Sequence, residues 1–324
     1  MRSIFVILFT GLLAISCNDG KKEAGAYLPK SYGMINHVLV VTDNDKWNGQ
    51  VGDAIREIFA AEFIGVLNPE PIYTLRHLEP KAFSGTVTKH RNILIVENGE
   101  SNFDIKDNVY AKHQKLIKVS GGTDEEIIEN LKENAEKGIT NLKANEMKEK
   151  QQMILLSPNQ QKDLEEKFGI TLQMPSVYKT VRNEDKFLWI ERPTSNGTMN
   201  LLVYELPAGF IAKDSTMVTE FVKLRDSIGK NFVPGRLKDS YMITEAAFAP
   251  FINDDIIDNK PATEIRGRWE LEGNFMAGPF VNYIIEDKEN ERQIVVEGFV
   301  FAPQKDKRDQ LFELEAIIRS LNVK

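Results

Sequence analysis

Short apolar runs divided by polar segments mark the first third of the chain. Residues 37–42 (HVLVVT) and 92–97 (NILIVE) are continuous hydrophobic stretches of the length and composition of fully buried strands. Asp43-Asn44-Asp45, directly after the first run, can cap a helix that we expect over residues 46–66. Buried strands that alternate with helices indicate an α/β arrangement for this half.

The apolar pattern then changes to a helical period. Thr123 and Glu126 have the spacing of a capping box, which predicts that a long helix begins there. Apolar residues recur every three or four positions along it, namely Ile128, Leu131, Ala135, Ile139 and Leu142. A further helix is expected to begin at Ser157-Pro158 and to end at Gly169. We interpret this helical stretch as the connection between two domains.

The second half reads mostly as strands. Polar and glycine-containing clusters separate the strand candidates, which cover residues 177–182, 187–192, 199–206, 264–272, 280–286 and 294–301. Helices are expected over residues 216–228 and 306–321. The charged turn at residues 287–291 is typical of an antiparallel meander. The predicted fold class is therefore α+β, with an N-terminal α/β half, long connecting helices, and a C-terminal antiparallel sheet that has helices packed on one side.

The N-terminus has the pattern of an export signal. Arg2 precedes an apolar run over residues 4–13, which is shorter than the roughly 20 residues that a membrane-spanning helix needs. Residues 13–17 (LAISC) resemble a bacterial lipobox. That resemblance implies cleavage before Cys17 and attachment of diacylglycerol and a fatty acyl group such as palmitate to this residue. The alternative is that Cys17, the only cysteine, is an ordinary buried side chain.

These features predict the division of the chain and its location. We expect a signal peptide at residues 1–16, a lipidated tether at 17–33, an N-terminal α/β domain at 34–122, connecting helices at 123–169 and a C-terminal α+β domain at 170–324. Residues 18–23 match poorly the signals that send lipoproteins to the cell surface. The expected location is therefore the outer membrane, where the lipid anchors the protein on the periplasmic side.

Composition narrows the range of functions. The chain is 42% hydrophobic and 27% charged, as in ordinary folded proteins, and its formal net charge is −7. An acidic chain disfavours nucleic acid as a partner. The four histidines are scattered, and neither a nucleophile elbow nor a phosphate-binding loop occurs, so we expect no metal site, no cofactor and no catalytic residue. The rival hypothesis is a glycan hydrolase that uses the loop carboxylates Asp254 and Asp258.

One stretch, residues 266–280, combines arginine and aromatic side chains. Arginine and tryptophan often anchor recognition, so the candidate binding residues are Arg266, Arg268, Trp269 and Phe275, together with Tyr241 from the preceding segment. A structural interpretation is equally open, because a strand that alternates these residues buries Trp269 and leaves the charges in solvent. Arg236 could share a pocket with this stretch only if its own segment folds back.

Residues 266–280, 295–303 and 305–308 resemble an uncharacterised lipoprotein family of Bacteroidota. The resemblance implies residence in the cell envelope and supplies no catalytic residue. The order strand, strand, helix around Ala302-Pro303 is also similar to the small α-β-α sandwiches of the photosystem-associated PsbP type. The leading hypothesis is a non-catalytic binding or assembly module of the envelope, whose partner is a protein or a small envelope ligand.

Overall fold

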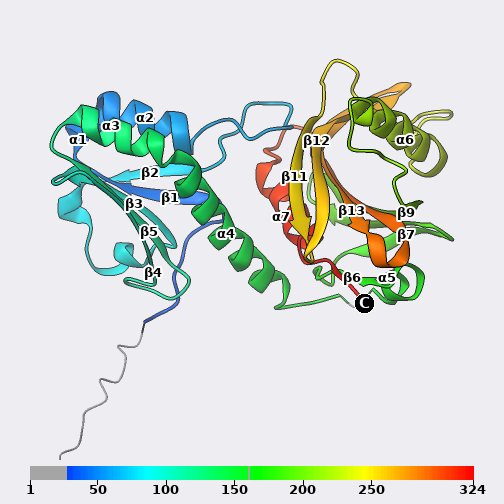
Figure 1. The fold of residues 1–324 in the computed structure, drawn as a ribbon, viewed down its shortest axis with the longest axis horizontal. Coiled ribbons are helices and arrows are strands. Elements are labelled where there is room, and N and C mark those ends of the chain that lie inside the picture. The colour runs from blue at the N-terminus through cyan, green and yellow to red at the C-terminus, as the bar shows by residue number, and fades with distance from the viewer. Residues whose placement is uncertain (1–27, 160) are drawn as a thin grey trace, which may run out of the picture.

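The computed structural model describes residues 28–159 and 161–324, so the predicted signal peptide and Cys17 lie outside the described residues. Two sheets, each with its own helices, are connected by a long helix that runs diagonally between them (Figure 1). The predicted α+β class is confirmed. In the described part of the chain, no helix has both the length and the apolar content that crossing a membrane requires.

The first sheet has five strands in the order β2-β1-β3-β5-β4, of which the first four are parallel and β4 is antiparallel. The strands are β1 (His37–Val41), β2 (Thr74–Leu78), β3 (Asn92–Asn98), β4 (Asn102–Asp107) and β5 (Lys115–Gly121). All five residues of β1 are buried, which explains its uninterrupted apolar sequence. The α/β arrangement predicted for this half is confirmed.

The helix expected over residues 46–66 is shorter and broken. It consists of α1 (Asn44–Asn48) and α2 (Gln50–Phe59), separated by Gly49 in an extended conformation. The two helices pack closely, because a Cβ added to Gly52 would lie 1.9 Å from the carbonyl oxygen of Trp47. The lack of a side chain at Gly52 therefore permits this contact. Two short 3₁₀ helices, η1 (Pro80–Ala82) and η2 (Gly85–Lys89), follow β2.

The predicted capping box is present, and two helices follow it instead of one. Glu126 donates its backbone N–H to Thr123 Oγ1 at 3.3 Å, where α3 (Asp124–Glu133) begins. The helix is interrupted at Asn134, and a second helix, α4 (Ala135–Ile154), follows. Leu142 of α4 packs into the core of the first sheet, whereas Met147 and Ile154 pack into that of the second. The helix α4 is thus shared by both cores.

The helix start predicted at Ser157-Pro158 is wrong. Pro158 pairs with Pro175 in an isolated β-bridge, and the helix α5 (Lys162–Phe168) begins after it. Proline is compatible with either setting because its fixed φ suits extended backbone as well as the first helical turn. The predicted end is confirmed, since Gly169 adopts a left-handed conformation with φ of 58°.

The second sheet is antiparallel, with the order β10-β12-β13-β14-β9-β8-β7 and with β11 paired to β12. Its strands are β7 (Lys179–Glu184), β8 (Phe187–Thr194), β9 (Gly197–Pro207), β10 (Tyr241–Thr244), β11 (Phe251–Ile257), β12 (Lys260–Glu272), β13 (Asn274–Asp287) and β14 (Arg292–Phe301). The predicted meander is confirmed as β12-β13-β14, with η3 (Lys288–Asn290) in its last turn. The strands β6 (Ile170–Thr171) and β15 (Asn322–Val323) form a separate pair.

Helices cover both faces of the second sheet, not one face as expected. On β9, Leu202 and Tyr204 pack on the side of α6 (Met217–Phe232), whereas Leu201 and Val203 pack on the side of α7 (Arg308–Ile318). A strand buried on both faces is apolar at consecutive positions, as this one is. The helix α7 is itself enclosed, since residues 311–318 are all buried.

The start of α7 is held by a side chain from the other domain. The carboxylate of Glu70, in the segment between α2 and β2, accepts hydrogen bonds from the backbone N–H groups of Lys307 at 2.8 Å and Arg308 at 2.7 Å. A carboxylate at a helix N-terminus satisfies otherwise unpaired donors and complements the helix dipole. This contact fixes the first domain against the second.

A buried ion pair attaches α6 to the sheet. Arg225 and Glu297 are each about 1% exposed, and Arg225 Nη2 lies 2.8 Å from Glu297 Oε1. Asn282 donates to the other carboxylate oxygen at 3.0 Å, and the guanidinium lies 4.0 Å from the ring centroid of Phe280. Because both charged side chains are buried away from water, each is stabilised mainly by the opposite charge of the other.

We expect Arg225→Met to lower the free energy of unfolding by about 3–5 kcal/mol, because it leaves a buried carboxylate without its cation. Adding Glu297→Gln removes that charge and keeps the acceptor for Asn282, so the double variant should recover at least half of the loss. Urea unfolding measures both. Lys213→Met, which removes an exposed ion pair with Asp254, serves as the control and should cost less than about 1 kcal/mol. A single variant as stable as the control would contradict the assignment.

Candidate functional site

Strand alternation on β12 separates the predicted binding residues. Trp269 faces α6 and is only 2% exposed, as the structural interpretation expected. Arg266 faces the opposite side and contacts Glu315 of α7. Because adjacent positions of a strand point to opposite faces, residues that are neighbours in the sequence lie in different sites.

Arg266 belongs to a buried cluster of charges between the two domains. Its Nη2 lies 2.7 Å from Glu264 Oε1 and 2.5 Å from Glu315 Oε2. Lys143 of α4 adds a cation 2.8 Å from Glu315 Oε1, and Tyr283 donates its hydroxyl to Glu264 at 2.6 Å. A cavity of about 230 Å³ beside the cluster is lined by Phe63, Ile72, Tyr73 and Phe312 among others.

The opposite charges in this cluster neutralise one another. Burial alone would raise the pKa of Glu315, but Arg266, Lys143 and Arg319 lower it well below its usual value. Burial and the two nearby carboxylates raise the pKa of the Tyr283 hydroxyl well above normal. Every carboxylate here has a cationic partner, so the cluster joins helices and strands and offers no unpaired acid or base for catalysis among these residues.

The other three predicted residues lie apart from one another. Arg268 donates to the carbonyl oxygen of Val66 at 2.7 Å and lies 4.1 Å from the ring centroid of Phe248, so it contributes to the domain interface. Phe275, at the tip of the β12–β13 hairpin, is fully exposed. Tyr241 lies on the edge strand β10, and its ring centroid is 5.6 Å from Lys230 Nζ.

The α6 face of the second sheet contains an aromatic pocket of about 170 Å³ around Trp269. Large apolar side chains from five strands line it, namely Trp189, Met242, Trp269, Leu271, Met276, Phe299 and Phe301. The ring centroids of Trp269 and Phe299 are 5.6 Å apart in an edge-to-face arrangement. A Cβ on Gly278 would lie 2.8 Å from Trp269 Nε1, so glycine makes room for the indole. A volume of this order accommodates one aromatic ring.

The segment after α6 folds back over this pocket. Met242 donates its N–H to the carbonyl of Val233 at 3.1 Å, and Gly235 donates to Ser240 at 2.8 Å, which makes a tight hairpin. Arg236 therefore lines the pocket together with Glu191. Burial raises the pKa of Glu191, and the nearby arginine partly offsets this effect. The sequence analysis named Arg236 only conditionally and missed Trp189 and Glu191, which come from a distant strand.

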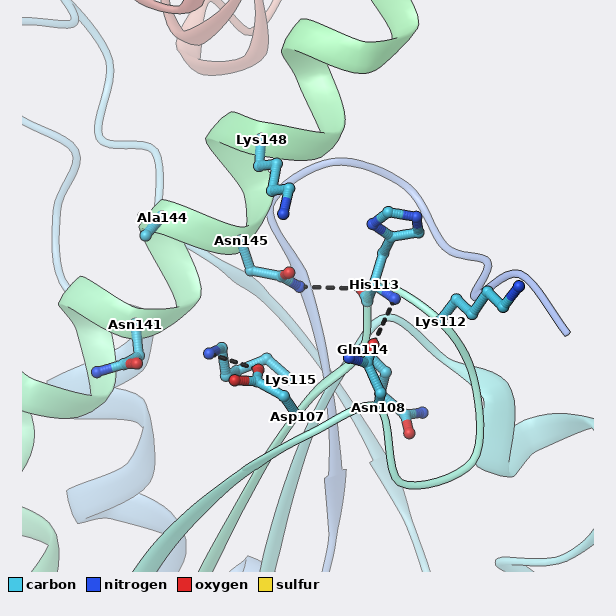
Figure 2. Close-up of a pocket in the computed structure, with 10 residues that line it drawn as sticks. All are labelled: Asp107, Asn108, Lys112, His113, Gln114, Lys115, Asn141, Ala144, Asn145 and Lys148. Atoms are coloured by element: carbon cyan, nitrogen blue, oxygen red, sulfur yellow. Dashed lines mark hydrogen bonds and ion pairs between the residues drawn. The ribbon is translucent and has the colours of Figure 1, made fainter. Parts of the chain in front are cut away.

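A second and larger pocket lies in the N-terminal half, between α4 and the loop that joins β4 to β5 (Figure 2). Its volume is about 490 Å³, and nine of its ten lining residues have polar side chains, with four of the ten from α4 and six from the β4–β5 region. The α4 residues are Asn141, Ala144, Asn145 and Lys148, which recur at helical spacing on one face. That spacing was visible in the sequence, but a polar stripe normally indicates only a solvated helix face.

The carboxylates of the hydrolase hypothesis are held by different partners. Asp254 lies 2.7 Å from Lys213 Nζ, whereas Asp258 accepts from Asn322 Nδ2 at 3.1 Å and from the Val323 N–H at 2.8 Å. Across residues 28–159 and 161–324, no group of three or more histidine, cysteine or carboxylate side chains is arranged to hold a metal ion.

Two family models match the chain. The model described as a domain of unknown function (DUF4837) matches residues 157–320, about half of the sequence. The chain belongs to the DUF4837 family. A second domain of unknown function (DUF8532) matches residues 31–155, so the two matches meet near the end of α4. The prediction of an uncharacterised family is confirmed, whereas the lipid anchor and the bacterial phylum stay predictions.

This DUF4837 protein also has distant matches among solved structures. The Ran-binding protein Mog1p of Saccharomyces cerevisiae is 9% identical, with a TM-score of 0.31 over 48% of this chain and 90% of Mog1p. LpqN of Mycobacterium tuberculosis, described as involved in cell envelope biogenesis, is 12% identical, with a TM-score of 0.26 over 46% of this chain and 79% of LpqN. No curated protein matches the sequence.

The Glu315 cluster predicts a loss of stability in acid. Since the folded-state pKa of Glu315 lies below its unfolded value of about 4.3, its contribution is complete above that pH and disappears as the pH falls towards the folded pKa. We expect Glu315→Gln to lower the free energy of unfolding by about 3–5 kcal/mol near pH 7 and to flatten its decline between about pH 5 and pH 3.

Urea unfolding at a series of pH values tests this expectation. Glu165→Gln is a matched control, because Glu165 pairs with Lys324 at the surface and is 53% exposed. It should change stability by less than about 1 kcal/mol at every pH. If the free energy of unfolding fell equally steeply with pH below about pH 5 in wild type and Glu315→Gln, other groups would be the cause of the decline.

Proposed function

We propose that this protein is a non-catalytic binding module of the cell envelope, anchored by lipid on Cys17, that takes one apolar side chain of a partner protein into the pocket around Trp269. The aromatic pocket is the observation that supports the proposal most directly. Its volume of about 170 Å³ suits a single ring or branched side chain and is small for an extended ligand.

The composition of the pocket matches that of protein-binding hot spots. Trp189 is partly exposed, and its Nε1 donates to Asn200 at 3.0 Å, so the ring is held in a fixed orientation at the pocket wall. Arg236 and Glu191 supply opposite charges at the same pocket. Small pockets that bind an anchor residue of a partner protein typically have a buried apolar centre with a few polar groups beside it.

The hydrolase hypothesis receives less support from the geometry. Glycan hydrolysis requires two carboxylates that face each other across a substrate. Asp254 and Asp258 instead contact a lysine and the C-terminal strand, respectively. The proposed location, on the periplasmic side of the outer membrane, rests on the N-terminal sequence alone.

The pocket is tested by filling it. Thr198 lines the pocket at the start of β9, so Thr198→Phe should occupy the space that the partner's side chain enters. Cross-linking in membranes that contain the lipidated protein is expected to capture a partner with wild type and with Thr180→Phe, an exposed position on β7. Capture should fall at least about tenfold with Thr198→Phe. Equal capture by the two variants would exclude the pocket as the binding site.

The anchor is tested by intact-mass analysis of the natural protein purified from membranes. We expect a chain that begins at Cys17 and carries the mass of a diacylglycerol and an acyl group, and we expect Cys17→Ser to abolish both processing and lipid. Two or three acyl chains hold a protein stably at a bilayer. A chain that still begins at Met1, or one that begins later with a free thiol, would overturn the anchor.

A further inference from the structure

The polar pocket beside α4 has a local charge opposite to that of the whole chain. The formal net charge of the protein is −7, yet the ten lining residues include three lysines and a histidine and only one carboxylate. That carboxylate, Asp107, is neutralised by Lys115 at 2.6 Å. Lys148 is exposed and faces the same space as the His113 ring (Figure 2).

The nearby acids outside the pocket are also paired. Glu149 lies 3.1 Å from Lys30 Nζ and 3.9 Å from Arg91 Nη1, and Glu146 lies 2.8 Å from Arg91 Nε. The positive charge of Lys148 is therefore not cancelled by these carboxylates. A concave surface with a local excess of lysine attracts anions even on an acidic protein.

The walls of this pocket are fixed by hydrogen bonds. Asn145 donates to the carbonyl of His113 at 3.2 Å and to Asn92 Oδ1 at 3.0 Å, which joins α4 to the loop. Gln114 donates to the carbonyls of Thr88 and His90 at 2.7 and 2.8 Å. The Asn141 amide donates to the carbonyl of Lys137 at 2.9 Å and has a second N–H, and this N–H and the Lys148 ammonium group are hydrogen-bond donors of the kind that phosphate oxygens accept.

The pocket also lies where the described chain begins. Ser31 donates its N–H to the carbonyl of Lys112 at 3.1 Å, and Lys112 donates to the carbonyl of Pro29 at 2.8 Å. Ser31 Oγ further donates to the carbonyl of His113 at 3.3 Å. Ten residues lie between Cys17 and Leu28, and the eleven steps from one to the other span at most about 40 Å. Lipid on Cys17 would therefore hold this pocket close to the membrane surface.

We infer that the pocket between α4 and the β4–β5 loop binds the phosphate of an anionic phospholipid headgroup. The inference rests on the proposed lipid anchor, which brings the pocket to the bilayer. Lys148 supplies positive charge from the helix, and His113 and the β4–β5 loop line the opposite wall. This contact orients the N-terminal domain on the membrane.

The test uses the chain from residue 17 to 324 with Cys17→Ser, so that binding does not depend on acylation. Co-sedimentation compares vesicles of phosphatidylcholine with vesicles that contain about one-third phosphatidylglycerol. We expect binding to the anionic vesicles only, reduced about fivefold to tenfold by Lys148→Glu. Lys223→Glu, which makes the same change in charge at an exposed position on α6, should leave binding unchanged.

Each other outcome overturns the inference in a distinct way. Equal loss with Lys148→Glu and Lys223→Glu would mean that net charge, not the pocket, governs binding. Equal binding to both vesicle types would exclude the headgroup charge. Complete displacement by inorganic phosphate at a matching phosphate concentration would identify a site for the free ion. Because this protein carries no lipid, these results are independent of the mass analysis of Cys17.

Discussion

A fully buried carboxylate cannot remain ionised without cations around it, and Glu315 in the middle of α7 imposes this requirement on three elements. Arg266 comes from β12, Lys143 from α4 and Arg319 from the turn that ends α7. The helix that belongs to both cores and the sheet of the second domain are therefore fixed to the same side chain. The relative position of the two domains follows from this constraint.

The cap on α7 extends the same constraint to the first domain. Glu70 supplies acceptors for the first free N–H groups of α7, so the helix is held at its start by one domain and in its middle by α4. Both contacts cross between domains, and in each of them the carboxylate, of Glu70 or of Glu315, is buried. A fixed arrangement of this kind keeps the pocket beside α4 and the aromatic pocket under the 233–242 hairpin at a constant separation.

Periodic features predicted the elements well, and features set by tertiary contacts did not. The continuous apolar runs of β1 and β3 and the capping box at Thr123 were informative because burial and backbone geometry are local requirements. The break at Gly49 was missed because it serves the packing of α1 on α2. The edge strand β4 carries mostly polar residues, and in the edge strand β11 the polar run Asn253-Asp254-Asp255 interrupts the apolar residues, so hydrophobic pattern alone could not reveal them.

The candidate site shows why a conspicuous stretch of sequence is a poor guide to a pocket. Residues 266–280 contain arginines and aromatics in one segment, yet strand alternation assigns Arg266 to the domain interface and Trp269 to the opposite face. The partners of Trp269 come from β8 and β14, and Arg236 joins them only because its hairpin folds back. A pocket on one face of a sheet is composed of residues on neighbouring strands whose side chains point to that same face. Strand register, which the sequence does not show for long-range pairs, therefore decides which residues can act together.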